Sequence, residues 1–97
     1  MRVNAKRKLR EYGDRIPDAK ASLDSWYYEA IHTTWNSQSD IEAKYRHASV
    51  LKNGRVVFNI AENRHRLVVS LNYKASIVMI KFIGTQEEYD KINAEDV

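Results

Sequence analysis

Residues 55–72, RVVFNIAENRHRLVVSLN, decide the fold. Both halves are rich in β-branched and aromatic residues, and Glu62-Asn63 separates them, so the stretch predicts two strands over about 55–61 and 64–72 joined by a tight turn. A two-residue turn pairs Ala61 with Arg64 and Asn59 with Arg66. The stretch is therefore the central antiparallel hairpin of a sheet.

Turns on either side extend this hairpin. Asn53-Gly54 is a strong hairpin signal because a type I′ turn needs positive φ at both central residues, and it joins a strand over 47–52 to the central pair. Lys74-Ala75 is expected to join the pair to a strand over 76–83. Two-residue turns at these two places pair Val50 with Val57 and Val68 with Lys81. The result is a four-stranded antiparallel meander.

Helical patterns flank the four strands. We expect a short extended piece at 2–4 that adds an edge strand, followed by helices over about 5–12, 17–33 and 39–45, and a short helix after the last strand. Gly13 fits a helix stop and Pro17 a first helical turn. Ser39 to Glu42 and Thr85 to Glu88 both have the capping-box spacing. The chain is predicted to be one α+β domain over 1–97, with amino-terminal helices packed on the sheet.

Composition narrows the class of protein. The 97 residues include no cysteine, which excludes disulfides and thiol chemistry. No apolar run approaches the roughly 20 residues that span a bilayer, and no apolar stretch follows the basic first ten residues as in a signal peptide. We expect a cytoplasmic protein with no membrane partner.

Positive charge is concentrated in the middle of the chain. Residues 44–81 carry eight Lys and Arg against one acid, Glu62, whereas residues 82–97 carry one Lys and five acids. Such clustering is typical of a surface that binds a polyanion, although solvated strand residues produce the same count.

The predicted register sorts these side chains by face. One face carries Arg46, Lys52, Arg55, Asn59, Arg64, Arg66 and Lys81. The opposite face is apolar and forms the expected core: Leu51, Val56, Phe58, Ile60, Leu67, Val69, Leu71, Val78, Ile80 and Phe82. The basic face also holds Val57, Val68, Ile77 and Met79, and the carboxy-terminal helix is the nearest segment to cover them. That helix would bring Gln86, Tyr89 or Asp90 near Arg66, while simple packing of Tyr89 is the alternative.

Other catalytic patterns are missing. His65 and His47 are expected on the core side and His32 on the second helix, so packing or solvation explains them better than catalysis. The three histidines lack metal-ligand spacing. There is no Gly-rich phosphate loop, nucleophile elbow or paired-carboxylate site. We therefore expect no metal and no cofactor.

The motifs nevertheless resemble a known family. The chain closely resembles HigB-type toxins, which are members of the RelE-like superfamily. The resemblance lies in residues 55–60 with Asn63, Arg66-Leu67-Val68, Asn72-Tyr73, Gly84-Thr85 and Glu88-Tyr89-Asp90. The segments that come earlier in the chain also resemble the family, at Trp26-Tyr27, Trp35, Asp40-Ile41 and Ala48-Ser49. The likeness covers nearly the whole chain in order.

The resemblance implies a RelE-like fold and a ribosome-dependent endoribonuclease that cuts mRNA without a metal ion. Its implied partners are the ribosome, mRNA and a cognate HigA-type antitoxin. By position, the family's strand arginine is Arg66, its last-strand basic residue is Lys81, and its carboxy-terminal tyrosine is Tyr89. Two positions depart from the family: Gln86 replaces a histidine and Glu62 replaces a turn glycine.

Cleavage of RNA without a metal ion requires side chains that stabilise negative charge and side chains that transfer protons. The planar guanidinium of Arg66 is suited to bind two oxygens of the negatively charged phosphorane. Arg55 and Arg64 are suited to bind the flanking phosphates. Lys81 and Tyr89 are candidates for proton transfer if neighbouring cations lower their pKa values, which normally lie near 10. Arg46, Lys52, Asn59 and Gln86 complete the predicted RNA-binding set.

Two other functions remain open from the sequence. The same basic face would suit a non-catalytic RNA- or ribosome-binding module, for which Gln86 argues. It would also suit an interaction domain whose cations only receive an acidic antitoxin segment.

Overall fold

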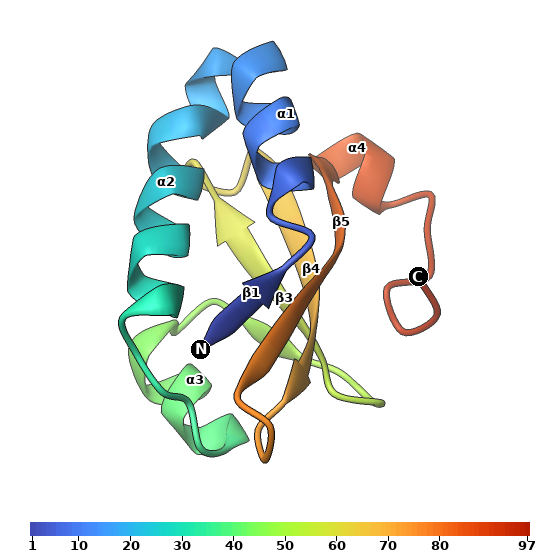
Figure 1. The fold of residues 1–97 in the computed structure, drawn as a ribbon. Coiled ribbons are helices and arrows are strands. Elements are labelled where there is room, and N and C mark those ends of the chain that lie inside the picture. The colour runs from blue at the N-terminus through green and yellow to red at the C-terminus, as the bar shows by residue number, and fades with distance from the viewer.

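The computed structural model describes residues 1–97 as an α+β fold in which helices and sheet form two layers (Figure 1). The elements in chain order are β1 (Arg2–Asn4), α1 (Arg7–Arg15), α2 (Pro17–Ile31), α3 (Gln38–Lys44), β2 (Ser49–Val50), β3 (Arg55–Ile60), β4 (His65–Asn72), β5 (Ile77–Thr85) and α4 (Gln86–Tyr89). None of the helices is both long and apolar enough to cross a bilayer.

The sheet has five strands in the order β1-β5-β4-β3-β2. The extended piece at the amino terminus is confirmed as an edge strand, and it runs parallel to β5, which makes the sheet mixed. The other neighbours are antiparallel, as expected of a meander.

The predicted register of the central hairpin is confirmed. Asn59 lies opposite Arg66 and Ile60 opposite His65. The turn holds Glu62 at φ 56° and Asn63 at φ 74°, so glutamate adopts the left-handed backbone that a glycine would adopt with less strain.

The pairing expected across Asn53-Gly54 is wrong by one residue. Both turn residues have the positive φ that was expected, but the Leu51 N–H bonds to the Arg55 carbonyl, 2.8 Å away, so that Val50 lies opposite Val56. The strand expected over 47–52 is only two residues long. Leu51 consequently leaves the core face.

The last hairpin contains a bulge that the sequence pattern did not reveal. Val69 lies opposite Ile80 as predicted, but Val68 lies opposite Phe82 rather than Lys81. The extra residue is Lys81, and beyond it the side chains of β5 change faces. Phe82 therefore leaves the core and Ile83 packs against it.

The helices follow the predicted order with two corrections at their ends. Gly13 does not end α1: it is buried inside the helix, where a Cβ would meet Lys20 at 3.5 Å. The helix ends at Arg15 because Ile16 precedes Pro17 and takes a non-helical backbone. The expected capping box of α3 is also wrong. Ser37 is the N-cap residue, without a side-chain cap hydrogen bond.

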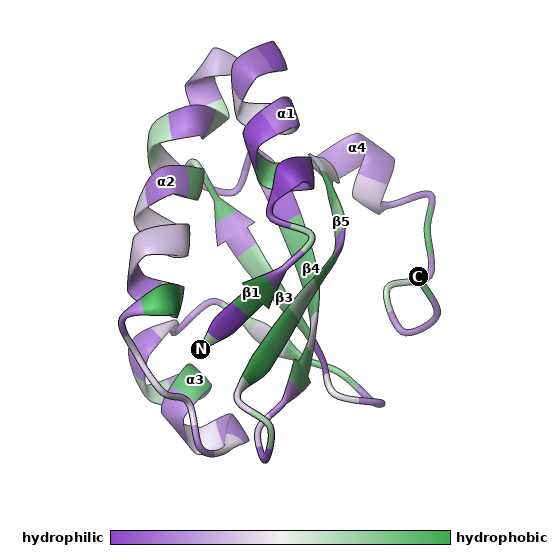
Figure 2. Ribbon diagram, viewed as in Figure 1, coloured by the Kyte–Doolittle hydropathy of each residue, from purple (hydrophilic) through white to green (hydrophobic).

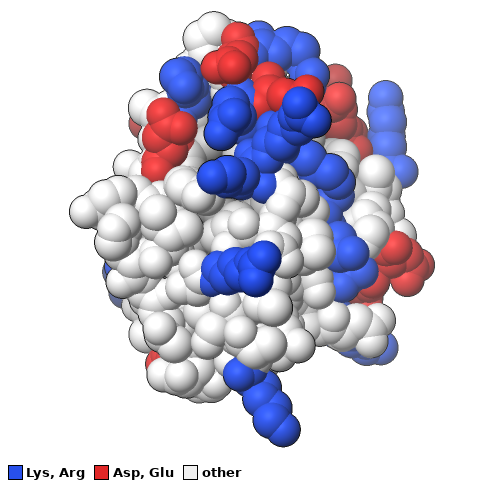
Figure 3. All heavy atoms as spheres, viewed as in Figure 1, with Lys and Arg blue, Asp and Glu red and all other residues white.

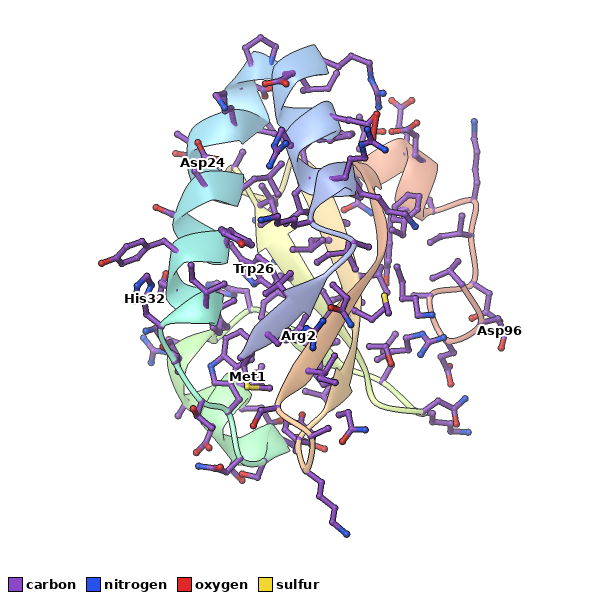
Figure 4. All side chains as sticks on the ribbon, in the orientation of Figure 1. Met1, Arg2, Asp24, Trp26, His32 and Asp96 are labelled. Atoms are coloured by element: carbon purple, nitrogen blue, oxygen red, sulfur yellow. The ribbon has the colours of Figure 1, made fainter.

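The main core lies between the helices and one face of the sheet. Leu23 and Trp26 of α2 and Leu9 of α1 pack with Phe58 of β3 and Leu67 of β4. Hydropathy follows this layering, with apolar residues on the strands and polar residues on the outer sides of α1 and α2 (Figure 2). Trp26 points from α2 toward the sheet, whereas Asp24 and His32 lie on the outside of the helix (Figure 4).

A second, smaller cluster covers the other face of the sheet. Val57 and Val68 are buried there beneath Ala94, and the partly buried Phe82, Tyr89 and Ile92 surround them. Tyr89 of α4 and the segment after it cover the two valines, whereas Ile77 and Met79, which the helix was also expected to cover, are not part of this cluster. We call this side, which faces away from α1 and α2, the outer face.

Candidate nucleic-acid interface

Arg55, Asn59 and Arg66 share the outer face of the sheet, as predicted. Arg55 and Asn59 alternate along β3 with buried residues, and Arg66 lies directly opposite Asn59 on β4. All three side chains are only partly buried. Two strands thus present two arginines and an amide as one row.

Arg66 is anchored through one of its nitrogens. Nη1 donates to the carbonyl of Asn63 at 2.7 Å and to that of His65 at 3.2 Å. The other guanidinium nitrogens have no protein partner, so Arg66 is held in place and still has donors for an anion. On its other side Arg66 lies opposite Gly84 of β5.

Arg55 is already engaged. Its Nη2 donates to the main-chain oxygen of Val97 at 2.7 Å, whereas its buried Nε has no partner. The carboxy-terminal segment that carries Asp96 follows α4 on the side of the molecule away from α2 (Figure 4). Arg55 therefore binds the carboxy-terminal segment through its hydrogen bond to Val97.

Arg64 leans toward the helices. Its Nε donates to the Ala61 carbonyl at 3.0 Å and lies 3.6 Å from Oδ2 of Asp18, the second residue of α2. The exposed guanidinium is at the end of the central hairpin rather than in the row of Arg55, Asn59 and Arg66.

Arg46 and Lys52 lie outside that row as well. Lys52 is exposed in the turn before β3. Arg46 is exposed beside a cavity of about 790 Å³ between α2 and the edge of β3, which His47 also lines. The expected core position of His47 is wrong, because β2 begins only at Ser49 and His47 precedes it.

The bulge at Lys81 moves this residue toward α1. Lys81 lines a pocket together with Lys8, Tyr12 and Arg15 of α1. It was expected beside Val68 on the outer face, which Phe82 now occupies.

Tyr89 and Gln86 extend from the short helix that follows β5. Tyr89 packs against the outer cluster, as the packing alternative anticipated. Gln86 donates from Nε2 to Asp90 at 2.6 Å, and its buried Oε1 has no partner. The backbone N–H of Gln86 bonds to the Arg64 carbonyl at 3.2 Å, which ties α4 to the start of β4.

The capping box that opens α4 is confirmed. The Thr85 hydroxyl accepts from the Glu88 N–H, and the Glu88 carboxylate accepts from the Thr85 N–H at 2.8 Å. The hydrogen bond from the Thr85 backbone lowers the pKa of Glu88. The box fixes where α4 leaves the sheet and hence where Tyr89 lies.

No hydrogen bond joins Arg66, Lys81 and Tyr89, the three residues expected to carry the reaction, and no single pocket or cluster contains all three. Lys81 and Phe82 line one pocket, Tyr89 and Phe82 belong to one cluster, and Arg66 lies opposite Gly84, over which the Phe82 ring sits. A Cβ at Gly84 would come within 2.6 Å of that ring, so the close approach requires glycine.

A buried hydrogen-bonded chain, which the sequence reading did not identify, lies at the same end of the sheet. The Tyr12 hydroxyl bonds to Nδ1 of His65 at 2.8 Å, and Nε2 of His65 bonds to Oδ2 of Asp18 at 3.2 Å. His65 is buried on the core side, as expected. Burial raises the pKa of Tyr12, and the carboxylates of Glu88 and Asp18 raise it further, so the hydroxyl keeps its proton.

The structure brings together no group of three or more side chains with the donor types of a metal site. The polar groups at this end of the sheet include the guanidinium of Arg66 and the hydrogen-bonded chain of Tyr12, His65 and Asp18. Anion binding and proton transfer are the chemistry that such groups support.

Comparison with known proteins identifies one family. The family described as HigB_toxin, RelE-like toxic component of a toxin–antitoxin system, matches residues 19–92. The match includes Arg66, Lys81 and Tyr89 and leaves out β1 and α1. No individual curated protein matches the chain.

Proposed function

The chain belongs to the HigB family of RelE-like toxic components of toxin–antitoxin systems, and from this premise we propose that it is an endoribonuclease that cuts mRNA on the ribosome. In this proposal a HigA-type antitoxin holds the toxin inactive, and the toxin acts in the cytoplasm. The fold agrees with the RelE-like architecture expected from the sequence: amino-terminal helices, an antiparallel core of strands and a short terminal helix.

The observation that carries the proposal is the state of Arg66. One nitrogen is fixed by two backbone carbonyls while the rest of the guanidinium has no protein partner. A pre-positioned guanidinium with vacant donors is suited to grip two oxygens of a phosphate. Asn59 lies opposite Arg66 on the neighbouring strand, where its Nδ2 donates to the His47 carbonyl at 3.4 Å.

The reaction that we propose is an attack within the RNA. The ribose 2′-oxygen loses its proton and bonds to the adjacent phosphorus, and the bond from phosphorus to the 5′-oxygen breaks. The products are a 2′,3′-cyclic phosphate and a 5′-hydroxyl. Arg66 stabilises the negative charge on the non-bridging oxygens of the crowded phosphorane. Lys81 and Tyr89 are the proposed proton-transfer residues, one removing the 2′-proton and the other protonating the 5′-oxygen.

Replacing Arg66 tests this role. Arg66→Ala is expected to lower the cleavage rate on purified translating ribosomes by roughly tenfold or more, because the phosphorane loses its guanidinium. Arg66→Lys keeps the charge without the planar fork and should recover only part of the rate. The matched control is Arg7→Ala, an exposed arginine of α1 outside the row, which should cleave at the wild-type rate. A wild-type rate in folded Arg66→Ala protein would refute the role.

A second candidate function is a non-catalytic RNA- or ribosome-binding module on the same face. Gln86 favours it, because this residue stands where the family often has histidine and its amide is engaged with Asp90. Toe-printing on programmed ribosomes separates the two functions. Cuts within codons support the enzyme, whereas inhibited translation with uncut mRNA supports the binding module.

A further inference from the structure

A pocket of about 320 Å³ lies between α1 and the bulge of β5. Three cations surround it, Lys8 and Arg15 from α1 and Lys81 from β5, with Glu11 as the one acid. The sequence does not reveal this pocket, because the first 43 residues have balanced charge and alternation along 76–83 does not show the bulge. The fold brings these charges together from opposite ends of the chain.

The cations of this pocket form no ion pairs in the structure, although Glu11 lines the pocket and Glu88 is close enough to Arg15 for that charge to contribute to its lowered pKa. None of the three cations has a carboxylate within 4 Å, whereas Lys20 lies near both Asp14 and Asp24. Figure 3 shows that Lys and Arg side chains gather over α1, with Asp and Glu side chains among them, and reach down beside β5, while the lower half of this face carries few charges. Unpaired cations that converge on one hollow attract an anion.

The wall of the pocket is held rigidly. Tyr12 lines it and is fixed from behind by its hydrogen bond to His65, which Asp18 holds in turn. The guanidinium of Arg15 lies 5.4 Å from the centre of the Tyr12 ring, a cation–π arrangement. This contact orients Arg15 without using any guanidinium N–H group. The N–H groups therefore remain available to donate to phosphate oxygens.

We propose that this pocket binds a phosphate group of an RNA backbone, apart from the row of Arg55, Asn59 and Arg66. The inference rests on the proposed function for the source of the RNA, which is either mRNA or ribosomal RNA; the two share the phosphodiester that the pocket recognises. Because Lys81 lines the pocket, an RNA strand held here passes beside a residue of the proposed reaction.

The test compares two double variants of the full chain that remove equal charge from the same helix. Lys8→Gln with Arg15→Gln removes pocket cations, and Arg7→Gln with Arg10→Gln removes exposed cations outside it. The probe is a fluorescent single-stranded 2′-O-methyl RNA, which cannot be cut. Fluorescence anisotropy over a series of salt concentrations gives the affinity and its salt slope.

We expect the pocket variant to bind the oligonucleotide roughly tenfold or more weakly and with a shallower salt slope, because phosphate contacts release counterions. The control variant should lose no more than about threefold in affinity, as expected for distant charges that are screened by salt. Equal losses in both variants, or no loss by the pocket variant with either the oligonucleotide or ribosomes, would overturn the proposal. Thermal unfolding of each variant shows that the fold is intact.

Co-sedimentation with vacant ribosomes forms the second arm. A loss seen only with the oligonucleotide assigns the pocket to mRNA, and a loss seen only with ribosomes assigns it to ribosomal RNA; both support the proposal. A pocket variant that binds both RNAs normally but loses binding to poly-glutamate indicates an acidic protein partner and overturns it. If wild-type protein cuts no mRNA yet binds RNA through the pocket, the proposed function fails and this inference stands.

Discussion

At the residue scale, the burial of His65 can be predicted from the sequence, whereas its hydrogen-bond partners cannot. Its burial on the core side followed from alternation along β4, since its neighbours Arg64 and Arg66 face other surroundings. Its partners did not follow, because Tyr12 and Asp18 lie on two helices that are remote in sequence. A buried imidazole is stable only when its polar atoms are paired, and here both nitrogens are.

The same pairing predicts the cost of losing His65. His65→Ala should lower the free energy of unfolding by about 2–4 kcal/mol, because it leaves a cavity and removes the partners of Tyr12 and Asp18. Tyr12→Phe removes one hydrogen bond and should cost about 1–2 kcal/mol. The exposed His47→Ala, at a histidine whose side chain makes no hydrogen bond, is the control, with an effect within about 0.5 kcal/mol. Urea unfolding measures all three, and a His65→Ala protein as stable as the control would show that the chain of hydrogen bonds contributes little.

At the element scale, the segment after α4 determines how much of the outer face is available. Asn93 organises it, bonding through its side chain to the Glu95 N–H and to Asp96. Ala94 is 7% exposed against Val57 and Val68. Removing these valines from water stabilises the segment in proportion to the apolar area buried.

A charge at position 94 should therefore release the segment. We expect Ala94→Asp to raise the rate of tryptic cleavage after the exposed Lys91 by roughly tenfold, because cleavage requires local opening. Ala94→Ser conserves the volume and serves as the control, with a rate close to wild type. Mass spectrometry of timed digests identifies the cut, and equal rates in all three proteins would mean that Ala94 does not hold the segment.

At the scale of the whole molecule, three tyrosines link stability to pH. Burial raises the pKa values of Tyr12, Tyr45 and Tyr73, and for Tyr45 the carboxylate of Glu29 contributes as well. The folded state thus holds these protons more tightly than the unfolded chain. Stability is fully present below the usual tyrosine pKa of about 10 and is lost as the pH rises above it.

Tyr45→Phe should weaken that alkaline loss, since it removes one of the three groups. Urea midpoints measured between about pH 8 and pH 11 should fall less steeply for Tyr45→Phe than for wild type. Tyr28→Phe, at an exposed tyrosine, is the control and should keep the wild-type slope. Identical slopes in all three proteins would contradict the assigned burial effect.

The sequence predicted most of this molecule but not the details that place the site. Element order and the central register followed from strand propensity, turns and the cost of burying arginine. The bulge at Lys81 did not, because an extra residue in one strand leaves the alternation on each side intact. Phe82 was assigned to the wrong face because of this bulge. Leu51 was assigned to the wrong face because the pairing across Asn53-Gly54 is offset by one residue. The pocket beside α1 depends on the bulge and was therefore also missed.

Mapping of mRNA 5′-hydroxyl ends, after the chain alone is induced in a bacterium without its antitoxin, tests the proposed cleavage most directly. Wild-type protein should produce new ends inside coding regions on translated messages, and Arg66→Ala at the same expression level should produce few or none. Arrested growth with intact messages, or the same ends from both proteins, would contradict cleavage through Arg66.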